Sequence, residues 1–395
     1  MAKPKIRFKG YTDDWEQRKL NEYFNVSTAK NKDNHYGKED VLSVSGDYGI
    51  VNQIKFQGRS FAGATVANYG VVNTGDVVYT KSPLSTNPYG IIKANKGKAG
   101  IVSTLYAVYK PCKNVNSEFV QVYFELNSRM NNYMQPLVNK GAKNDMKVTA
   151  ENALKGGVCF PKLNEQNAIV EYFRSLDHLI TLHQRKCEET KKLKKYMLQK
   201  MFPQNGQTVP EIRFSGFTDA WEQRKFGDLV EKYEDPIDTP TDGYMRLGIR
   251  SHAKGTFHSY VEKGKELETA KMFRVAANNF IVNITFGWEH AVAITDESDA
   301  GKLVSHRFPQ YSFENGMIPM FFKYLILDEN FKHHLELSSP GGAGRNRVLK
   351  LNDMLEYKMK FPCEDEQRKL ASYFDDLDHL ITLHHRKYTS TLKSP

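Results

Sequence analysis

The strongest constraint on this chain is a segment that occurs twice. Residues 4–19 read PKIRFKGYTDDWEQRK and residues 210–225 read PEIRFSGFTDAWEQRK, with twelve of sixteen positions identical at an offset of 206. A second pair lies at an offset of 201, where LDHLITLHQRK (176–186) and LDHLITLHHRK (377–387) differ at one position in eleven. A chain that repeats both ends of a segment in this way is expected to contain two copies of one structural frame.

The residues between these blocks, 20–155 and 226–356, show little resemblance to each other. Each insert nevertheless shows the same order of patterns, with short β-rich runs bounded by Gly, Asn, Lys and Pro before a segment of helical periodicity. The helical segments are 117–134 and 317–337. Two similar frames are therefore predicted to hold two different mixed α/β inserts. The predicted strands lie within 49–56, 75–82, 89–95 and 103–111, and within 278–286, 289–295 and 302–311.

A long amphipathic helix is predicted after each Phe-Pro pair, at 160–161 and 361–362. Asn164 and Asp365 are short polar residues suited to capping the free amides, and the glutamate that follows each favours the helix dipole. Apolar residues then recur at alternating steps of four and three, which predicts a narrow seam against a partner helix. The seam residues are Ile169, Phe173, Leu176 and Ile180 in the first helix and Leu370, Phe374, Leu377 and Ile381 in the second.

The two predicted helices differ in length. The first extends from residue 164 to 201, which at about 1.5 Å per residue gives roughly 57 Å. Such a length favours a coiled coil, although two ordinary amphipathic helices, each packed on its own domain, are the alternative. The second helix ends at KYTSTLKSP (387–395), well short of the first.

Composition narrows the classes of partner. The formal net charge of +10 favours a polyanion, because Lys and Arg side chains gain free energy by releasing counterions from phosphates. The four cysteines are scattered without a CxxC pair, so reduced thiols are expected and a zinc site is not. No run approaches the roughly 18 to 20 apolar residues of a membrane helix, and the N-terminus leads into no signal-peptide core. We therefore expect a cytoplasmic protein.

The arrangement as a whole resembles the DNA-specificity subunit of type I restriction-modification enzymes. In that family two variable target recognition domains alternate with helix-forming spacers. The residues that carry the likeness are the two WEQRK segments (15–19 and 221–225), the strand and loop GDVVYTKSP (75–83), the Gly-containing loops near 141 and 342, and the Pro-x-x-x-Glu-Gln helix starts at 161 and 362. The resemblance covers essentially the whole chain.

The resemblance implies an α+β fold with a pseudo-two-fold internal repeat. Two globular mixed α/β target recognition domains are separated by two long helices that form an antiparallel coiled coil. The predicted domains are 1–157 (first frame segment and first target recognition domain), 158–206 (first helix and linker), 207–358 (second frame segment and second target recognition domain) and 359–395 (second, shortened helix).

The resemblance also implies function. The chain is expected to read a bipartite, asymmetric target on double-stranded DNA and to direct two methyltransferase subunits and two restriction or translocase subunits to it. S-adenosylmethionine, ATP and Mg are expected on those partners. No cofactor, metal or catalytic residue is expected in this chain.

Candidate DNA contacts are basic and polar residues in loops beside the predicted strands and in the two Gly-containing basic loops, 140–147 and 340–350. Taken singly, each is more simply a solvated surface residue, and only as a set do they form a footprint. The candidates are Lys81, Ser82, Lys93, Lys96, Lys98 and Lys143 in the first half, and Arg250, His252, Lys254, Thr285, Trp288, Arg345, Asn346 and Arg347 in the second.

Other motifs in the sequence also have structural interpretations. NPYG (87–90) is similar to the base-gripping loop of amino-methylating DNA enzymes but lacks its second proline, so a turn is predicted. His178 and His183 lie about 140° apart around a helix, so packing is expected instead of a shared metal. Trp15 and Trp221 belong to the repeated frame and are expected to anchor cores. A coiled-coil adaptor whose inserts bind proteins is the rival function, and steep salt dependence of duplex binding would separate the two.

Overall fold

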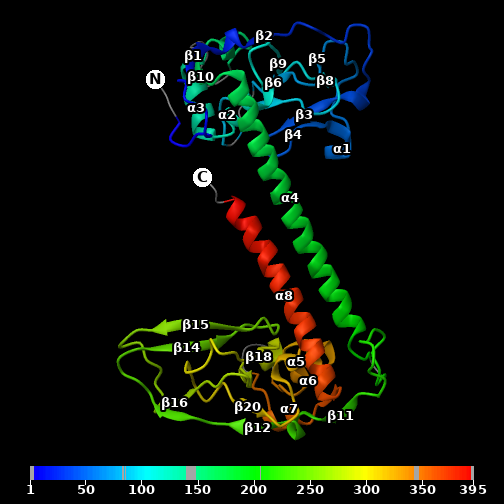
Figure 1. Cartoon of the computed structure of the whole chain (residues 1–395), viewed down its shortest axis with the longest axis vertical. Coiled ribbons are helices and arrows are strands. Elements are labelled where there is room, and N and C mark those ends of the chain that lie inside the picture. Colours follow the sequence, from blue (N-terminus) through cyan, green and yellow to red (C-terminus); the bar gives the residue numbers. More distant parts are fainter. Residues whose placement is uncertain are drawn as a thin grey trace. The chain divides into compact units, whose positions relative to one another are not determined.

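The computed structural model describes residues 4–81, 84, 86–138, 148–204, 206–341 and 347–392, with the backbone alone at 391 and 392, and the chain divides into two compact units (Figure 1). Unit 1 is Met1–Leu179 and unit 2 is Ile180–Pro395. Helix α4 (Leu163–Lys200) is continuous, and its first half belongs to unit 1 and its second half to unit 2. The long helix predicted over 164–201 is therefore confirmed as one uninterrupted element.

Unit 1 is built around a four-stranded antiparallel sheet with strand order β2 (Phe24–Val26), β9 (Ala107–Pro111), β6 (Val77–Tyr79) and β7 (Ile92–Ala94). Helices α2 (Ser117–Phe124) and α3 (Asn127–Met134) contribute Phe119, Phe124, Met130 and Met134 to the core that this sheet forms. The remaining elements are the antiparallel pairs β3 (Leu42–Ser45) with β4 (Gly49–Asn52) and β5 (Gly70–Val72) with β8 (Gly100–Val102), and helix α1 (Gln53–Gln57).

Unit 2 contains a four-stranded antiparallel sheet of equivalent connectivity, with strand order β12 (Val230–Tyr233), β20 (Gln310–Phe313), β17 (Phe280–Val282) and β18 (Val292–Ile294). A second, five-stranded sheet has the order β13 (Pro236–Asp238), β16 (Lys271–Arg274), β19 (Leu303–Val304), β14 (Tyr244–Ile249) and β15 (Thr256–Val261), in which β14 and β19 are parallel. The helices are α5 (Pro319–Leu325), α6 (Glu329–Leu337), α7 (Leu351–Leu355) and α8 (Glu364–Leu392).

The order of strands followed by helices is confirmed in both inserts, but several boundaries differ. The run 49–56 is strand β4 followed by helix α1, because the Asn52 side chain accepts from the Lys55 amide and starts a helix. Each helical segment is two helices instead of one. In unit 2 the break falls at Asp328, whose side chain accepts from the Asn330 amide and caps α6.

The repeated WEQRK segments form the edge of each frame. Strand β1 (Glu16–Lys19) pairs antiparallel with β10 (Gly157–Phe160), and β11 (Glu222–Lys225) pairs in the equivalent register with β21 (Lys358–Phe361). The first residue of each WEQRK strand lies opposite the Phe of the Phe-Pro pair, as Glu16 lies opposite Phe160. The two ends of each insert are therefore neighbouring strands.

A buried Arg-Glu pair ties each frame to its long helix. Arg7 Nε and Nη2 donate to the two carboxylate oxygens of Glu165 at 2.7 and 2.6 Å. Arg213 makes the same two bonds to Glu366 at 2.8 and 2.7 Å. The glutamate side chains are only 3% and 1% exposed, so these are desolvated, two-pronged ion pairs.

The start of each long helix differs from the predicted cap. The helices begin at Leu163 and Glu364, so Asn164 and Asp365 lie inside the first turn instead of capping it. Adjacent to the paired glutamate, Gln166 Nε2 donates to the Pro161 carbonyl at 2.9 Å, and its Oε1 accepts from the Asn116 amide at 2.9 Å. Gln367 repeats both bonds with Pro362 and Ile318. The Glu-Gln motif thus fixes the helix start and links it to the insert.

The residues of the predicted seam lie in two different environments. Leu370, Phe374 and Leu377 lie in the main core of unit 2 instead of a two-helix seam, because α5 and the end of α4 also cover α8 there. Beyond them, Cys187 Sγ of α4 lies 3.8 Å from the Ile381 carbonyl of α8. Ile180 and Ile381 are partly buried, as are Ile169 and Leu176 in unit 1, whereas Phe173 is exposed.

The recurring histidines meet in unit 2. The Nδ1 atoms of His183 and His384 are 3.2 Å apart, so one imidazole must donate and the other must accept. Burial lowers the pKa of His384, and the positive charges of His183, Lys186 and Lys387 lower it further. The two imidazole rings can therefore pack against each other only while at least one of them is neutral.

We predict that Arg213→Met destabilises unit 2 by about 3 kcal/mol, because it leaves the buried Glu366 carboxylate without its partner. Arg224→Met is the matched control, since the Arg224 side chain is 42% exposed and its contact with Glu222 is 4.0 Å. Denaturant unfolding followed by tryptophan fluorescence would measure both. Equal effects of the two substitutions would contradict a special role for the buried pair.

A second prediction concerns pH. Because the folded-state pKa of His384 lies below the ordinary value of 6.5, the unfolded chain binds this proton more readily. The stabilising contribution is complete above about pH 6.5 and is lost as pH falls below it. We expect the melting temperature of the wild-type chain to fall more steeply between pH 7.5 and 5.0 than that of His384→Gln. His379→Gln, at an exposed position on the same helix, should behave as wild type.

Candidate nucleic-acid interface

Four lysines that are candidates for DNA contact lie near strands β6 and β7 of unit 1. They differ in burial and in the groups that pair with them. Lys81 follows β6 in a left-handed conformation (φ 47°), and its Nζ donates to the Thr104 carbonyl at 2.9 Å. Burial lowers the pKa of Lys81, and nearby Lys30 adds to this effect. Lys93 is buried and its Nζ lies 2.8 Å from Glu125, so its charge is already compensated. Lys98 is exposed.

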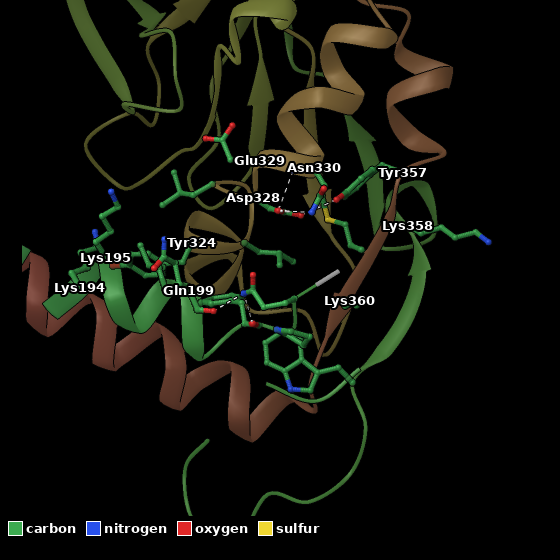
Figure 2. A pocket seen from close by; sticks show the side chains of 18 of the residues that line it. Lys194, Lys195, Gln199, Tyr324, Asp328, Glu329, Asn330, Tyr357, Lys358 and Lys360 are labelled. Carbon is green, nitrogen blue, oxygen red and sulfur yellow. Dashed lines mark hydrogen bonds between the residues drawn. The ribbon is translucent and has the colours of Figure 1, made fainter. Parts of the chain in front are cut away.

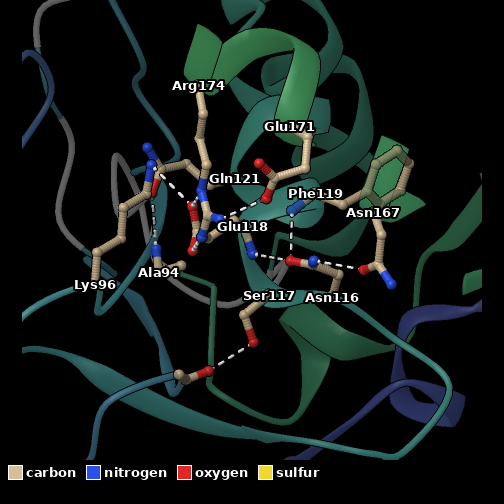
Figure 3. Close-up of polar contacts among 11 residues, drawn as sticks. Ala94, Lys96, Asn116, Ser117, Glu118, Phe119, Gln121, Asn167, Glu171 and Arg174 are labelled. Carbon is tan, nitrogen blue, oxygen red and sulfur yellow. Dashed lines mark hydrogen bonds and ion pairs between the residues drawn. The ribbon is translucent and has the colours of Figure 1, made fainter. Parts of the chain in front are cut away.

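Lys96 belongs to an ion-pair cluster that links the insert to α4 (Figure 3). Its Nζ lies 3.4 Å from Glu118 of α2, which also accepts from Arg174 Nε of α4 at 3.0 Å. Burial opposes ionisation of Glu118, but the bonds from Arg174 and the charge of Lys96 outweigh it and lower its pKa. The Lys96 side chain is 48% exposed, so its ammonium stays in contact with water while it pairs with Glu118.

The NPYG segment is a turn, as predicted. Asn87 and Leu84 exchange backbone hydrogen bonds at 3.1 and 3.0 Å, and the Gly90 amide donates to the Asn87 carbonyl at 2.9 Å. Gly90 has φ +87°, and a Cβ there would lie 2.7 Å from Thr80 Oγ1. The Asn87 side chain is buried and donates to Asn127 Oδ1 of α3 at 2.8 Å. This asparagine therefore packs inside unit 1.

In unit 2 the predicted basic segment 250–254 forms the turn between β14 and β15. His252 and Ala253 adopt left-handed conformations, and their amides donate to the carbonyls of Glu289 and His290 at 2.9 and 2.8 Å. These bonds fix the turn while leaving the His252 and Lys254 side chains exposed. Arg250 is also exposed, and its guanidinium lies 5.3 Å from the ring centroid of Phe257.

A cavity of about 690 Å³ lies beside this turn and brings together polar groups from four segments of unit 2. Arg307 Nη1 donates to Thr285 Oγ1 at 3.4 Å, and the Thr285 amide donates to Asn283 Oδ1 at 3.1 Å. Arginine, asparagine and hydroxyl side chains are the groups that read base edges. The cavity is lined by Arg246, Ser251, Asn283, Thr285, Ser305, His306 and Arg307, with Phe257, Phe286 and Phe308 and the acidic Glu268 and Glu289 among the others.

Of the residues lining this cavity, only Thr285 was among the sequence candidates. Arg246 lies in strand β14, which the sequence analysis did not predict, and His306 and Arg307 were missed because the run 302–311 was predicted to be one continuous strand. The signal available was the basic pair between two short apolar runs, which is typical of a loop leaving a sheet.

Two further candidates of unit 2 contact each other, and four candidates of the chain lie outside the described residues. Arg347 lies over the Trp288 ring at 5.5 Å, and Trp288 Nε1 is buried without a partner in the described part of the chain. Ser82, Lys143, Arg345 and Asn346 lie outside the described residues, as do all of the loop 140–147 and residues 342–346 of the second basic loop.

A larger cavity of about 880 Å³ lies between the end of α4, the α5–α6 segment and β21 (Figure 2). Tyr324 OH donates to Asp378 at 3.1 Å, and Tyr357 OH donates to Asp328 at 2.9 Å. Burial raises the pKa of both tyrosines, and the adjacent carboxylates raise it further, so both phenols stay protonated. None of the sequence candidates for DNA contact lines this cavity, which belongs to the frame.

The two tryptophans of the repeated segments anchor the cores, as predicted. Trp221 is buried in the main core of unit 2, and Trp15 packs against the core of unit 1. Among the described residues, no group of three or more His, Cys, Asp or Glu side chains is arranged to hold a metal ion. In the same residues, no helix has the length and apolar character needed to cross a membrane.

A comparison with known protein families gives a match for the first part of the chain. Residues 12–192 match the family model of the type I restriction modification DNA specificity domain. This segment of the chain belongs to the type I restriction-modification specificity family. The match covers β1, the first insert, β10 and most of α4. The frame contacts of this segment recur in unit 2, where β11 pairs with β21 and Arg213 pairs with Glu366.

Solved structures with similar folds extend over nearly the whole chain. The S subunit of a type I restriction-modification system from M. genitalium has a TM-score of 0.52 at 12% identity, covering 99% of this chain and 96% of that one. The HsdS subunit from Thermoanaerobacter tengcongensis has a TM-score of 0.47 at 12% identity, covering 96% and 93%. A search of the curated proteins found no match.

We predict that Arg307→Ala weakens binding to the cognate duplex by about 1–3 kcal/mol and relaxes discrimination at one base position. Lys265→Ala is the control, because this lysine is 73% exposed and pairs only with Glu262 three residues away. Competition binding of single-base variants of the target, with the methyltransferase partner present, would measure both. An equal loss across all sequences would instead identify Arg307 as a phosphate contact.

Proposed function

We propose that this chain reads a bipartite, asymmetric DNA target, with each unit contacting one half-site. The observation that carries the proposal is that one frame, closed by the same strand pair and the same buried Arg-Glu pair, holds two inserts with different surfaces. The common four-stranded sheet supports a common mode of approach, while the unlike loops favour different bases.

The proposal assigns the distance between half-sites to α4 and α8, acting as an antiparallel coiled coil with the units related by a pseudo-two-fold axis. Its support is the unbroken α4 and the order of its contacts with α8 inside unit 2. His183 meets His384, Cys187 meets Ile381, and Lys194 Nζ lies 2.6 Å from Asp378, so the two helices run in opposite directions. Half-site centres about one helical turn apart, roughly 10 bp, are expected.

The chain is proposed to act as the non-catalytic part of a larger assembly in the cytoplasm. Two methyltransferase subunits would supply S-adenosylmethionine and the modification chemistry. Two restriction or translocase subunits would supply ATP hydrolysis and Mg-dependent cleavage. In this assembly the chain binds DNA and positions its partners.

The test is an exchange of residues 226–356 for the second insert of another family member, followed by mapping of methylated motifs in genomic DNA. We expect one half of the target to change while the other half and the spacing stay the same, because each insert is closed on its own frame. The matched control is a chain prepared by the same exchange steps but carrying its own second insert. Simultaneous change of both halves would contradict independent reading, and loss of all sequence dependence at every salt concentration would favour an adaptor.

A further inference from the structure

A short turn joins two β-sheets at the same place in both units. In unit 1 it follows β8 and leads into β9, and in unit 2 it follows β19 and leads into β20. In the strand after the turn, Tyr109 pairs with Val77 and Tyr311 pairs with Phe280, which are the first residues of β6 and β17. The equivalent segments are VSTLYAVY (102–109) and VSHRFPQY (304–311), at an offset of 202.

Two hydrogen bonds fix this turn in each unit. In unit 1 Ser103 Oγ accepts from the Leu105 amide at 3.2 Å, and the Tyr106 amide donates to the Ser103 carbonyl at 3.0 Å. In unit 2 Ser305 makes the same two bonds, at 3.4 and 3.0 Å. A serine hydroxyl that bonds to the backbone two residues on stabilises a turn whatever side chains lie between. The serine and the backbone therefore set the shape of the turn.

The two positions at the tip of the turn, the tip pair, are exposed in both units but carry different side chains. Thr104 and Leu105 form the tip pair of unit 1, and His306 and Arg307 form that of unit 2. Leu105 is 63% exposed, so it contributes little to a core. Because the common bonds use none of these side chains, the tip pair can differ between the inserts while the backbone stays the same.

In both units the turn lies against the loop that follows an inner strand of the four-stranded sheet. In unit 2 Arg307 Nη1 donates to Thr285 Oγ1, in the loop after β17, at 3.4 Å. In unit 1 Lys81, after β6, donates from Nζ to the Thr104 carbonyl at 2.9 Å. The two turns therefore occupy the same place, each with one positive charge at this contact.

We propose that the two tip pairs are equivalent specificity-determining positions, each of which reads one base pair in the half-site of its own unit. This inference rests on the proposed function. Arginine reads guanine through O6 and N7 in the major groove, whereas an apolar side chain contacts the methyl group of thymine. Unit 2 therefore reads a G·C pair with Arg307, and unit 1 reads a T·A pair with Leu105 against the thymine methyl group.

The first test uses the wild-type chain with the methyltransferase partner and its mapped target. The half-site of unit 1 is the half that stays the same when residues 226–356 are exchanged. Each thymine of that half-site is replaced singly by uracil, which removes the methyl group and keeps the base pairing. We expect one replacement to weaken binding roughly threefold to fourfold, the effect of removing about one buried methyl group, in a competition assay.

The second test changes the tip pair of unit 1. Leu105→Arg should abolish the dependence on that methyl group and should shift the preference at the same base pair to guanine by about tenfold. Leu126→Arg is the matched control, because Leu126 is a 56% exposed leucine elsewhere in unit 1 and the variant carries the same added charge. It should keep the wild-type preference. Circular dichroism would verify that both variants remain folded.

The reciprocal substitution tests the equivalence of the two turns. Arg307→Leu should replace the preference for guanine in the other half-site by a dependence on a thymine methyl group at the same position. The half-site of unit 1 should stay unchanged, because the substitution lies in the other insert.

Three outcomes would overturn the proposal while leaving the proposed function intact. The first is that no uracil replacement in the half-site of unit 1 weakens binding by the wild-type chain. The second is that Leu105→Arg and Leu126→Arg have the same base preference. The third is a change of affinity with Leu105→Arg that is equal for all sequences, because the turn would then contact phosphates. If exchange of residues 226–356 changes both halves of the target, the proposed function itself fails, and the assignment of each tip pair to one half-site fails with it.

Discussion

The buried pair of Arg213 with Glu366, and its counterpart of Arg7 with Glu165, sets the geometry on which each unit depends. A carboxylate that is almost fully removed from water is tolerated only when its partner is close and well oriented, and the two-pronged guanidinium meets both conditions. The interaction joins a segment at the start of a unit to a helix that follows more than 150 residues later. The two segments that it joins adjoin the paired strands, β1 with β10 in unit 1 and β11 with β21 in unit 2.

The frame could be predicted from sequence because its signals are local and repeated. The helices after Phe-Pro, the strand-then-helix order of the inserts and the burial of the tryptophans all follow from periodicity and duplication. The helix starts were predicted incorrectly, because long-range bonds from Arg7 to Glu165 and from the Asn116 amide to Gln166 help to fix them, and no local pattern contains these bonds. The predicted two-helix seam was also only partly correct, because Phe374 is covered by α5 and Phe202 as well as by a second helix.

The candidate interface was harder to predict, because a side chain's surroundings depend on pairings between distant segments. Lys93 looks like an available cation in the sequence, yet its side chain is buried and pairs with the exposed Glu125 of a later segment. Arg307 looked like part of a strand, yet it lies next to Thr285 at a cavity. The sequence could predict only the region around the turn at 250–254, where glycine and basic residues alternate between two strands.

The pairing of β1 with β10 and of β11 with β21 also has a thermodynamic consequence. Because each insert begins and ends on adjacent strands, folding of the frame turns the insert into a closed loop. The entropy of closing such a loop rises only with the logarithm of its length, so the difference between inserts spanning 20–156 and 226–357 amounts to less than about 0.1 kcal/mol. Doubling an insert would add only about 0.6 kcal/mol. Evolution can therefore lengthen, shorten or replace the enclosed segment almost without a stability penalty, and selection on it can act through the surface it presents.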